Sequence, residues 1–395
     1  TAAGTVTNWD GITYTPYTGK FDRTLTIYAV VPLSGTAATY GLSIKLGFDQ
    51  AVADMNDMGG IMVGGSRYKV AVSYIDGKLD TATTIAAFQQ VVLQYNAKFV
   101  INDTTAMIMA TEDFLAQNNV FDFAQTIGQP KNMGAKWPLQ FMNGLDVADF
   151  GPCTYYGYLA SAMGVKTIAV VNQDADNGHL FDGFITNDVS AFNIPVTLID
   201  HQFYTPGTQD YTPLINKLMA EKPDCIDITS ATPAELALFS KQARGAGFKG
   251  VIADLSSQGD PAIAWNVAGA ASTGIVTIGF VGQDPTPLYT AWRQMIEKKT
   301  GQTMFVSVPY TYDEGLQWLM AINSTNSFDP YKVAAAFQDW KWNGLYGSMQ
   351  FHGDEPGSLI GLKRVIDVNQ PMIKFTTNGA AEWVVRLGYS GVPLK

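Results

Sequence analysis

The stretch that decides the fold is residues 25–61, LTIYAVVPLSGTAATYGLSIKLGFDQAVADMNDMGGI. It opens with an apolar, β-branched run, which is typical of a strand buried on both faces of a parallel sheet. A Pro-Leu-Ser-Gly sequence ends this strand, and residues 41–58 then carry apolar side chains at helical spacing. The Gly-Gly pair that follows is a strong stop for a helix. The stretch therefore predicts a buried strand followed by an amphipathic helix.

The same alternation of strand and helix continues along the chain. Further strands are predicted at residues 68–75, 98–101, 120–124, 166–171, 196–200, 224–229 and 250–254. Helices are predicted between and before them at residues 80–92, 106–118, 147–163, 178–192, 211–221 and 233–245. Short connections between such elements indicate parallel sheets with helices on both faces. We expect two similar α/β units of about 120 residues each.

The two ends of the chain follow different patterns. Residues 1–23 are rich in Thr, Gly and Tyr and lack periodicity, so we predict an irregular arm. From about residue 273 onward, short strands mix with helical stretches at 286–300, 310–323 and 330–340. This part is too fragmentary to build a core of its own. We expect it to complete the two units, with the chain crossing between them more than once.

Composition excludes several classes of partner. The chain has 395 residues, a formal net charge of -10 and only 15% charged residues. Nucleic acid is not expected as a partner, because neutralising its phosphates needs a basic surface, and an anionic membrane surface is disfavoured for the same reason. No apolar run reaches the about 18 residues that a membrane-spanning helix needs. The first residues, TAAG, contain no methionine, which we expect of a mature exported protein.

No motif predicts catalysis, a metal or a cofactor. Residues 245–250 fit G-x-G-x-x-G, but they follow a helix and precede a strand, which is the reverse of a dinucleotide site. The three histidines lie far apart in the sequence and show no metal-ligand spacing. We therefore predict no enzyme activity, no metal and no cofactor. The two cysteines, Cys153 and Cys225, are interpreted as buried, inert thiols, with a single disulfide as the alternative.

Polar side chains follow the predicted strands in both units. In open parallel sheets, ligands bind beyond the carboxyl ends of the strands, where helix N-termini also offer free backbone N–H groups. Hydroxyl and amide groups there are suited to contact a small ligand, although each could instead be an ordinary helix N-cap. The residues singled out as ligand-binding are Tyr40, Asp103, Thr104, Thr105, Gln125, Thr126, Asn177, Thr232, Ser256 and Ser257.

Three sequence blocks resemble the type I periplasmic binding proteins of the leucine/isoleucine/valine-binding kind. In the first block, a Pro-x-Ser-Gly loop and a Tyr-Gly pair precede the helix, and A-x-x-x-x-N-x-x-G-G-I closes it at residues 51–61. The second block is KPD at 222–224 with KQARGAGF at 241–248, and the third is YTYDEG at 310–315. The resemblance runs from about residue 24 to at least residue 365.

The resemblance implies an α/β fold of two Rossmann-like lobes, joined by a three-crossover hinge with the ligand in the cleft. We place the crossovers near residues 143–146, 270–275 and 344–349. We expect lobe one to comprise residues 24–143 and 272–346, and lobe two to comprise residues 144–271 and 347–395. The resemblance also implies a periplasmic or lipid-anchored solute-binding protein, a monomer, that closes around its ligand. Its partner would be the membrane permease of an ABC importer.

In the family that the chain resembles, Ser and Thr hydroxyls and backbone N–H groups of lobe one hold the ligand's carboxylate. The positions that match here are Thr104 or Thr105 and residues 125–126, with Tyr40 as the aromatic residue of the first loop. The matching positions of lobe two are Asn177, Thr232, and Ser256 or Ser257.

The chain departs from the family at the acid of lobe two that pairs with an amino acid's ammonium group. This position falls at Ser256-Ser257, so a bound ammonium group would lack its countercharge. Either Asp103, Asp254 or Asp260 substitutes, or the ligand is not an α-amino acid. A branched-chain or other amino acid, an aromatic or other organic acid, and an amide remain open as ligands.

Two other functions fit the same architecture. One is a ligand-sensing regulator or the ligand-binding domain of a receptor, which lacks a partner permease. The other is an enzyme on a two-lobed scaffold, such as a glycosyl transferase, which predicts turnover and an acid–base group with a strongly shifted pKa. Fold alone does not separate these functions from solute transport.

Overall fold

The structure is a computed structural model in which the chain forms two compact units. Unit one comprises Thr1–Leu145 and Pro285–Val368, and unit two comprises Asp146–Asp284 and Asn369–Lys395. The chain therefore passes from one unit to the other three times. The structure describes residues 4–34, 38–125, 133–142, 151–191, 193–255, 261–278, 287–301, 307–345, 347–354, 360–367 and 370–387.

Unit one is built on a mostly parallel sheet. Its described strands, in spatial order, are β14 (Lys341–Gly344), β15 (Gly347–His352), β16 (Val365–Asp367), β8 (Gln140–Met142), β7 (Phe121–Gln125), β6 (Phe99–Asp103), β3 (Arg23–Val31), β5 (Ser66–Asp76) and β4 (Ile61–Val63). The strands from β16 to β5 run parallel, and the strands at both edges are antiparallel. The apolar run that opens residues 25–61 is thus a central strand, as predicted.

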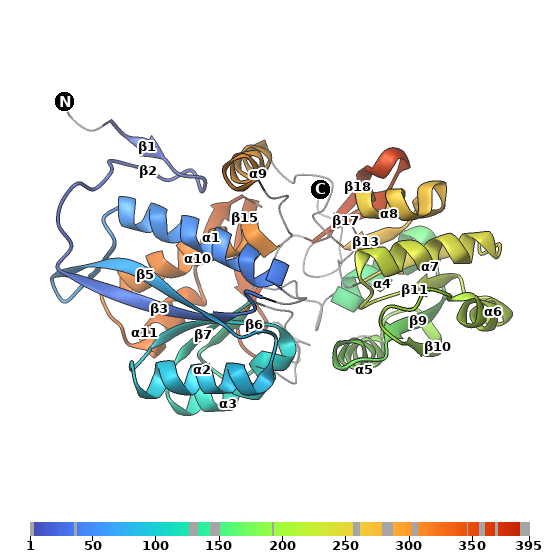
Figure 1. Cartoon of the computed structure of the whole chain (residues 1–395), viewed down its shortest axis with the longest axis horizontal. Helices are drawn as coiled ribbons and strands as arrows, with labels where there is room; N and C mark the ends of the chain where they lie inside the picture. Colours follow the sequence, from blue (N-terminus) through green and yellow to red (C-terminus); the bar gives the residue numbers. More distant parts are fainter. Residues whose placement is uncertain are drawn as a thin grey trace. The chain divides into compact units, whose positions relative to one another are not determined.

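Helices cover both faces of this sheet. They are α1 (Ala38–Asp57), α2 (Thr81–Leu93), α3 (Thr105–Gln117), α10 (Ser307–Thr325) and α11 (Pro330–Phe337). A further helix, α9 (Pro287–Thr300), packs against α10, with the ring centroids of Trp292 and Tyr312 5.4 Å apart. In Figure 1, α1 and α10 lie on one face of the sheet, and α2 and α3 lie on the other. Loops between strand and helix are short, which is the connection that parallel strands require.

The face covered by α10 holds an aromatic core. Trp318 of α10 is 0% exposed, and its ring centroid lies 5.3 Å from that of Phe121 and 5.0 Å from that of Phe123. Because side chains alternate along a strand, Phe121, Phe123 and the last residue of β7 point to this face. Asp122, between the two phenylalanines, points to the opposite face.

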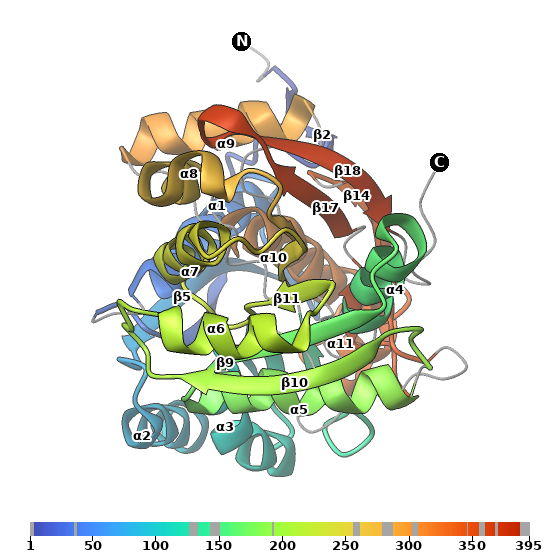
Figure 2. The same ribbon diagram turned by 90° about the vertical axis from the view of Figure 1, so that its right-hand side faces the viewer.

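Unit two is built in the same way. Its described strands, in spatial order, are β10 (Thr197–Tyr204), β9 (Thr167–Gln173), β11 (Cys225–Asp227), β12 (Val251–Asp254), β13 (Val276–Ile278), β17 (Gln370–Phe375) and β18 (Ala381–Leu387). Its helices are α4 (Gly151–Met163), α5 (Asp176–Ala191), α6 (Thr212–Glu221), α7 (Pro233–Gly245) and α8 (Pro261–Ala268), with 3-10 turns η1 (Gly269–Ser272) and η2 (Thr377–Gly379). Figure 2 shows α6 and α7 on one face of β9 and β10, and α5 on the other.

The two units repeat one topology. The parallel strands of unit one are ordered β5-β3-β6-β7-β8, and those of unit two are ordered β10-β9-β11-β12-β13. In each unit the first parallel strand lies between the second and the third: β3 between β5 and β6, and β9 between β10 and β11. This order confirms the predicted α/β fold with two Rossmann-like units. It also provides matched positions in the two units, which are compared below.

The boundaries of the units differ from the predicted division. Residues 272–346 were predicted for lobe one, yet β13 joins the sheet of unit two, with Val276 in register with Ala253 of β12. Residues 347–395 were predicted for lobe two, yet β15 and β16 lie in the sheet of unit one. The predicted crossover at 344–349 falls inside the antiparallel pair of β14 and β15, where Gly344 is in register with Gly347. Such a tight hairpin keeps both strands in one sheet.

The N-terminal arm belongs to unit one and is more regular than predicted. Its strands β1 (Val6–Thr7) and β2 (Thr13–Tyr14) form a small antiparallel pair. Asp10, in the turn between them, accepts a hydrogen bond of 2.6 Å from Nε2 of Gln317 in α10. Tyr17 stacks against Phe21, with ring centroids 5.3 Å apart. The guanidinium group of Arg67 in β5 lies over the Tyr17 ring, so this aromatic side chain of the arm packs on the body of the unit.

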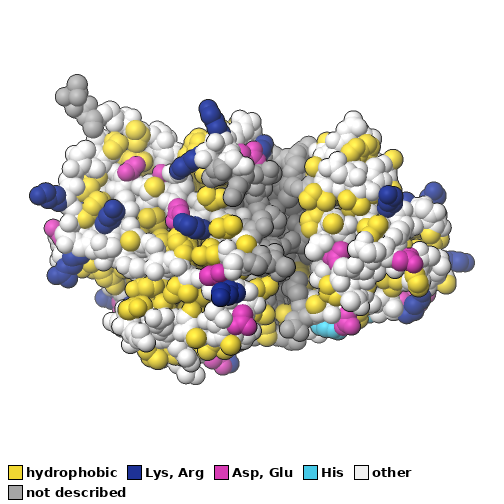
Figure 3. All heavy atoms as spheres, in the orientation of Figure 1, with side chains coloured by type: hydrophobic (Ala, Val, Ile, Leu, Met, Phe, Trp, Pro, Cys, Tyr) yellow, Lys and Arg dark blue, Asp and Glu magenta, His cyan; other side chains and the backbone are white. Residues whose placement is uncertain are grey.

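Charged side chains are sparse on the surface. On the face drawn in Figure 3, Lys and Arg side chains are scattered singly among uncharged and apolar groups. The described ion pairs are mostly exposed, such as Lys136–Asp113 and Lys363–Asp339. Exposed pairs of this kind contribute little to stability, so the fold depends on its buried cores.

Candidate functional site

The carboxyl ends of β3, β6 and β7 lie side by side in unit one. Val30 of β3 is in register with Asn102 of β6, and Asp103 at the end of β6 is in register with Gln125 at the end of β7. By the alternation of the strands, Asp103 and Gln125 point to the same face of the sheet, which α1 and α10 cover. This edge is where open parallel sheets bind their ligands.

The first turn of α1 lies directly against the end of β3. A Cβ atom at Gly41 would overlap the carbonyl oxygen of Pro32, so the helix can start here only with glycine. The loop after β3 is fixed by Asp76, which accepts hydrogen bonds from the Leu33 N–H (2.8 Å) and the Ser34 hydroxyl (2.5 Å). Tyr40, a predicted ligand residue, lies in this helical turn, and its side chain is outside the described part of the structure.

Unit two repeats this close approach. A Cβ atom at Gly178 in the first turn of α5 would overlap the carbonyl oxygen of Gln173 at the end of β9. Asn177, the predicted ligand residue, directly precedes Gly178, as Tyr40 precedes Gly41 in unit one. The side chain of Asn177 is outside the described part of the structure. The backbone therefore places the two predicted residues at matching positions of the two units.

The turn between β6 and α3 contains three of the predicted ligand residues. Asp103 is 4% exposed, and its Oδ1 accepts a hydrogen bond of 2.7 Å from the Thr104 N–H. Thr104 occupies the N-cap position of α3 but makes no side-chain cap hydrogen bond, and α3 begins at Thr105. Thr105 is buried. The turn therefore presents a carboxyl group, two hydroxyl groups and a helix N-terminus together.

Two polar atoms of this turn are buried without a partner among the described residues. They are Oδ2 of Asp103 and Oγ1 of Thr104. The backbone of Thr104 is also strained, with φ at 61° and ψ at 138°, a conformation that a β-branched residue rarely adopts. Unpaired buried polar atoms cost about 1–3 kcal/mol each, and strain of this kind costs a similar amount. Such costs are typical of sites that are completed by a ligand.

Burial has a clear electrostatic effect on Asp103. Removal from water raises the pKa of the Asp103 carboxyl to about 7, and the hydrogen bond from the Thr104 N–H opposes this rise. A bound group that donates a hydrogen bond to Oδ2 would lower the pKa again, because it stabilises the charged form. Asp103 therefore responds to the hydrogen-bonding character of whatever binds beside it.

Gln125 is held in place by α10. Its Oε1 accepts a hydrogen bond of 3.1 Å from the hydroxyl group of Thr311, and both residues are buried. Thr311 was not predicted as a site residue, because it is far from Gln125 in the sequence and only the folded chain brings the two residues together. Thr126, predicted beside Gln125, lies outside the described residues.

In unit two, the predicted ligand residue Thr232 is a helix cap. Its hydroxyl accepts a hydrogen bond from the Glu235 N–H, and its own backbone N–H donates one of 2.9 Å to Oε2 of Glu235, which completes a capping box at α7. Glu235 also accepts hydrogen bonds from the Gly207 N–H (2.8 Å) and from Nε2 of Gln173 (2.7 Å). Burial alone would raise the pKa of Glu235, but these hydrogen bonds hold it below its usual value. For Thr232 the geometry favours the capping alternative.

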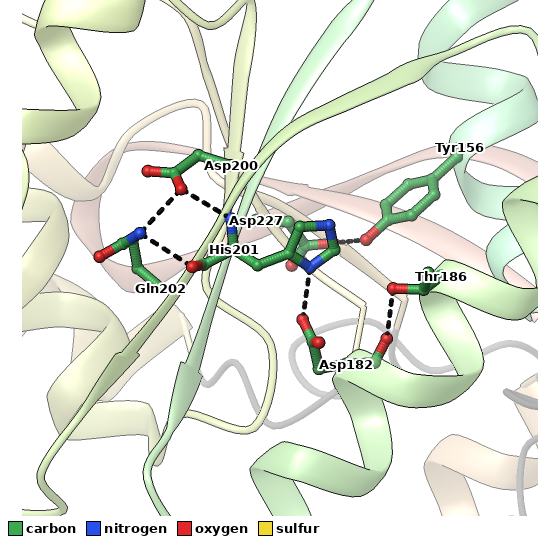
Figure 4. Close-up of polar contacts among 7 residues, drawn as sticks. All are labelled: Tyr156, Asp182, Thr186, Asp200, His201, Gln202 and Asp227. Carbon is green, nitrogen blue, oxygen red and sulfur yellow. Dashed lines mark hydrogen bonds and ion pairs between the residues drawn. The ribbon is translucent and has the colours of Figure 1, made fainter.

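The strand-to-helix turn of unit two is satisfied internally. Ser230 has φ at 63°, like Thr104, but its Oγ accepts a hydrogen bond of 2.9 Å from the Gln173 N–H. The Thr229 hydroxyl donates to Asp227, which also accepts a hydrogen bond of 2.7 Å from Tyr156 of α4 (Figure 4). Burial raises the pKa of Asp227, and its hydrogen bonds oppose the rise. The matching turns thus differ: that of unit one alone has buried polar atoms unpaired among the described residues.

Asn172 is a further candidate, a polar residue directly after the predicted strand at residues 166–171. It lies in β9, one residue before its end, and is 0% exposed. Both Oδ1 and Nδ2 of its side chain lack a partner among the described residues. In the sequence, Asn172 is marked only by its position as the polar residue after the apolar run TIAVV. Ser256 and Ser257, which were predicted for this unit, lie outside the described residues.

Metal-binding and thiol chemistry find little support in the described ranges. No group of three or more His, Cys, Asp and Glu side chains there could hold a metal ion. Nδ1 of His201 lies 2.6 Å from Oδ1 of Asp182, so this histidine joins β10 to α5 (Figure 4). Cys225 is a buried free thiol whose pKa is raised by burial, and the side chain of Cys153 lies outside the described part of the structure.

The strand-end site and the repeated topology agree with comparisons to known proteins. A family model described as periplasmic binding protein matches residues 24–365. The chain belongs to the periplasmic binding protein family. It is 25% identical over 345 residues to the Leu/Ile/Val-binding protein of Citrobacter freundii, covering 87% of this chain and 90% of that protein. The predicted resemblance to type I, leucine/isoleucine/valine-binding members is confirmed.

Solved structures show the same fold. One is a leucine binding protein from Thermotoga maritima, with a TM-score of 0.70, 19% identity, and coverage of 91% of this chain and 97% of that chain. Another is a solute binding protein of an ABC transporter from R. palustris in complex with benzoate, with a TM-score of 0.72, 15% identity, and coverage of 94% and 97%. In this periplasmic binding protein, none of the described helices is long and apolar enough to cross a membrane.

Proposed function

We propose that this periplasmic binding protein is the extracytoplasmic solute-binding component of an ABC importer. It binds a small polar molecule at the carboxyl ends of its parallel strands, closes around it and delivers it to a membrane permease. Leucine and benzoate, named for the two structural relatives, are both small molecules with a carboxylate and an apolar body. These relatives support a small organic solute as the ligand, and the residues of this chain's own site determine which solute binds.

The observation that carries the proposal is the unsatisfied turn of unit one. Asp103 and Thr104 keep buried polar atoms unpaired at the strand edge, beside the N-terminus of α3. The matching turn of unit two has used its hydroxyl groups within the protein. Buried polar atoms of stable folds are nearly always hydrogen-bonded, so unpaired ones at a ligand-binding strand edge favour a bound group. A ligand that completes these hydrogen bonds accounts for the difference between the two turns.

A thermal-shift screen of the whole chain tests the proposal. The panel holds aliphatic amino acids, aromatic carboxylates, dicarboxylates and short amides. A ligand present at about 100-fold its Kd adds about 2.7 kcal/mol to the free energy of unfolding, which gives a visible rise in Tm. Saturable stabilisation by one chemical class is the expected result. A flat response across the panel, repeated by calorimetric titration, would count against a small-solute binding function.

Thr104→Gly is expected to make the protein more stable and weaker in binding. Glycine tolerates φ at 61°, so the free energy of unfolding rises by about 1 kcal/mol. Loss of the hydroxyl removes a hydrogen bond to the ligand, which costs about 1–3 kcal/mol of binding free energy. Chemical denaturation measures the first effect, and titration with the best ligand of the screen measures the second.

Lys222→Gly provides the matched control. Lys222 also has a positive φ, 56°, but it caps the C-terminus of α6, ahead of the amino end of β11. Its replacement should raise stability by a similar amount, about 1 kcal/mol, and leave ligand affinity unchanged. Equal affinities of wild type and Thr104→Gly would remove Thr104 from the site.

A further inference from the structure

The turn at Asp103 offers two opposite kinds of hydrogen-bonding group in one place. Oδ2 of Asp103 is an unpaired acceptor in a residue that is only 4% exposed. The first hydrogen bond of α3 runs from the Ile108 N–H to the Thr104 carbonyl, so the N–H groups of Ala106 and Met107 have no partner within the helix. The Thr104 hydroxyl is also unpaired among the described residues. An acceptor and several donors therefore lie next to each other.

A carboxylate ligand is a poor match for this arrangement. Burial and the Thr104 N–H are the influences on the Asp103 carboxyl, and no described Lys or Arg offsets its charge. Above the Asp103 pKa of about 7, a ligand carboxylate beside the ionised carboxyl would bring two negative charges together in a buried place, which is costly. The helix N-terminus attracts an anion, but Asp103 occupies part of that field already through its contact with the Thr104 N–H.

An ammonium group is also a poor match. It would pair with Asp103, but it has only donors and would give no acceptor to the Ala106 and Met107 N–H groups. Its positive charge would also face the positive end of the helix dipole. A neutral planar group that carries both an N–H donor and a C=O acceptor satisfies both sides of the turn.

We propose that unit one binds the primary amide or urea-type end of its ligand, with Asp103 Oδ2 accepting from the ligand N–H, and the Thr104 hydroxyl and the Ala106 and Met107 N–H groups donating to its C=O. This inference rests on the proposed solute-binding function and narrows its ligand class. The remaining, apolar or polar body of the ligand is not specified by this turn. Asp103 thereby becomes the residue that distinguishes an amide from the corresponding acid.

The test compares matched ligands that differ only in this group. Benzamide, benzoate and benzylamine form one trio, and valeramide, valerate and pentylamine form another. Affinities of the full chain are measured by calorimetric titration at about pH 8, above the Asp103 pKa of about 7. The amide should bind at least about tenfold more tightly than the acid and the amine in one trio or both.

Substitution of Asp103 should reverse this order. In Asp103→Asn the new side-chain amide can donate a hydrogen bond to a ligand carboxylate. With an amide ligand, however, its N–H group would face the ligand N–H, so two donors would meet without an acceptor. We expect the amide to lose about tenfold in affinity and the carboxylate to gain a similar factor. Asp122→Asn is the matched control, because Asp122 is a buried aspartate of the same unit on the opposite face of the sheet, outside the site. It should leave the order of the ligands unchanged.

The outcomes separate the inference from the proposed function. A wild type that binds the acid or the amine more tightly than the amide overturns the inference and leaves solute binding in place. An order that persists unchanged in Asp103→Asn overturns it as well. Failure of every amide to bind also overturns it, whereas the proposed function fails only if the wider panel of the thermal-shift screen is flat.

Discussion

Asp122→Asn is expected to raise the free energy of unfolding by about 4 kcal/mol at about pH 8.5 and to leave it nearly unchanged at about pH 4. Asp122 is 2% exposed and lies in β7 on the sheet face opposite the ligand site. Burial raises the pKa of its carboxyl to about 7, although the amides of Asn102 and Gln140 oppose this rise. The folded protein must therefore release a proton from a buried group as the solution becomes basic.

The sign of the effect follows from the two pKa values. An unfolded chain has Asp122 with its ordinary pKa of about 4, so the folded state holds the proton between about pH 4 and pH 7 while the unfolded state has lost it. Stability is thus highest at low pH and falls as the pH rises through this window. Asparagine resembles the protonated acid in shape and never ionises, so it removes the loss. Urea denaturation at several pH values measures the difference.

Asp224→Asn is the control with the opposite sign. Asp224 is exposed and accepts hydrogen bonds from the Lys166 N–H (2.9 Å) and the Thr167 N–H (3.0 Å), which lower its pKa. Its stabilising effect is present above the unfolded pKa and is lost on acidification, so this substitution should destabilise the protein at neutral and basic pH. Equal effects of the two substitutions at about pH 8.5 would contradict the assignment of Asp122.

Asp122 is one of several carboxyl groups with the same behaviour. Burial raises the pKa of Glu112 to about 8, and burial is also the largest cause of the raised pKa of Asp10, Asp54, Asp103 and Asp227. Wild-type stability should therefore decline between about pH 5 and pH 8. With 15% charged residues, the chain has few cations to offset buried acids. We expect the protein to be most stable in mildly acidic solution.

The sequence predicted the strand-end positions well but could not decide which of them face a ligand. Thr104 and Thr232 both connect a strand to a helix, and both were predicted as ligand residues. Thr232 is followed three residues later by Glu235, the pattern of a capping box, and the structure shows that box. Thr104 is followed at the same distance by Met107, which cannot complete one. This difference in pattern was available in the sequence and would have separated the two threonines.

Other features depend on contacts that no local pattern records. β13 and β16 have three residues each, so their partners β12 and β8 are set by the folded sheet rather than by their own sequence. Thr311 reaches Gln125 from a distant part of the chain. The helices from 286 onward were predicted nearly at their observed positions because their apolar spacing is local. Long-range pairing therefore explains why the elements were predicted better than the division into units.

Gly41→Ala is expected to destabilise the protein by about 3 kcal/mol and to weaken ligand binding by about 10-fold. A Cβ atom at this position overlaps the Pro32 carbonyl oxygen, which belongs to the backbone and cannot move aside alone. The first turn of α1 must then shift away from the end of β3, and the predicted ligand residue Tyr40 shifts with it. Gly178→Ala should act in the same way at α5 and Asn177.

Gly183→Ala separates this close approach from the general effect of a helical glycine. Gly183 lies in α5, as Gly178 does, but a Cβ atom there meets nothing within 4 Å. Alanine should therefore stabilise α5 by about 0.5–1 kcal/mol and leave binding unchanged, because it lowers the entropy cost of folding. If Gly178→Ala behaved like Gly183→Ala, the helix would not need to touch the strand end, and the matching places of Tyr40 and Asn177 would lose their structural basis.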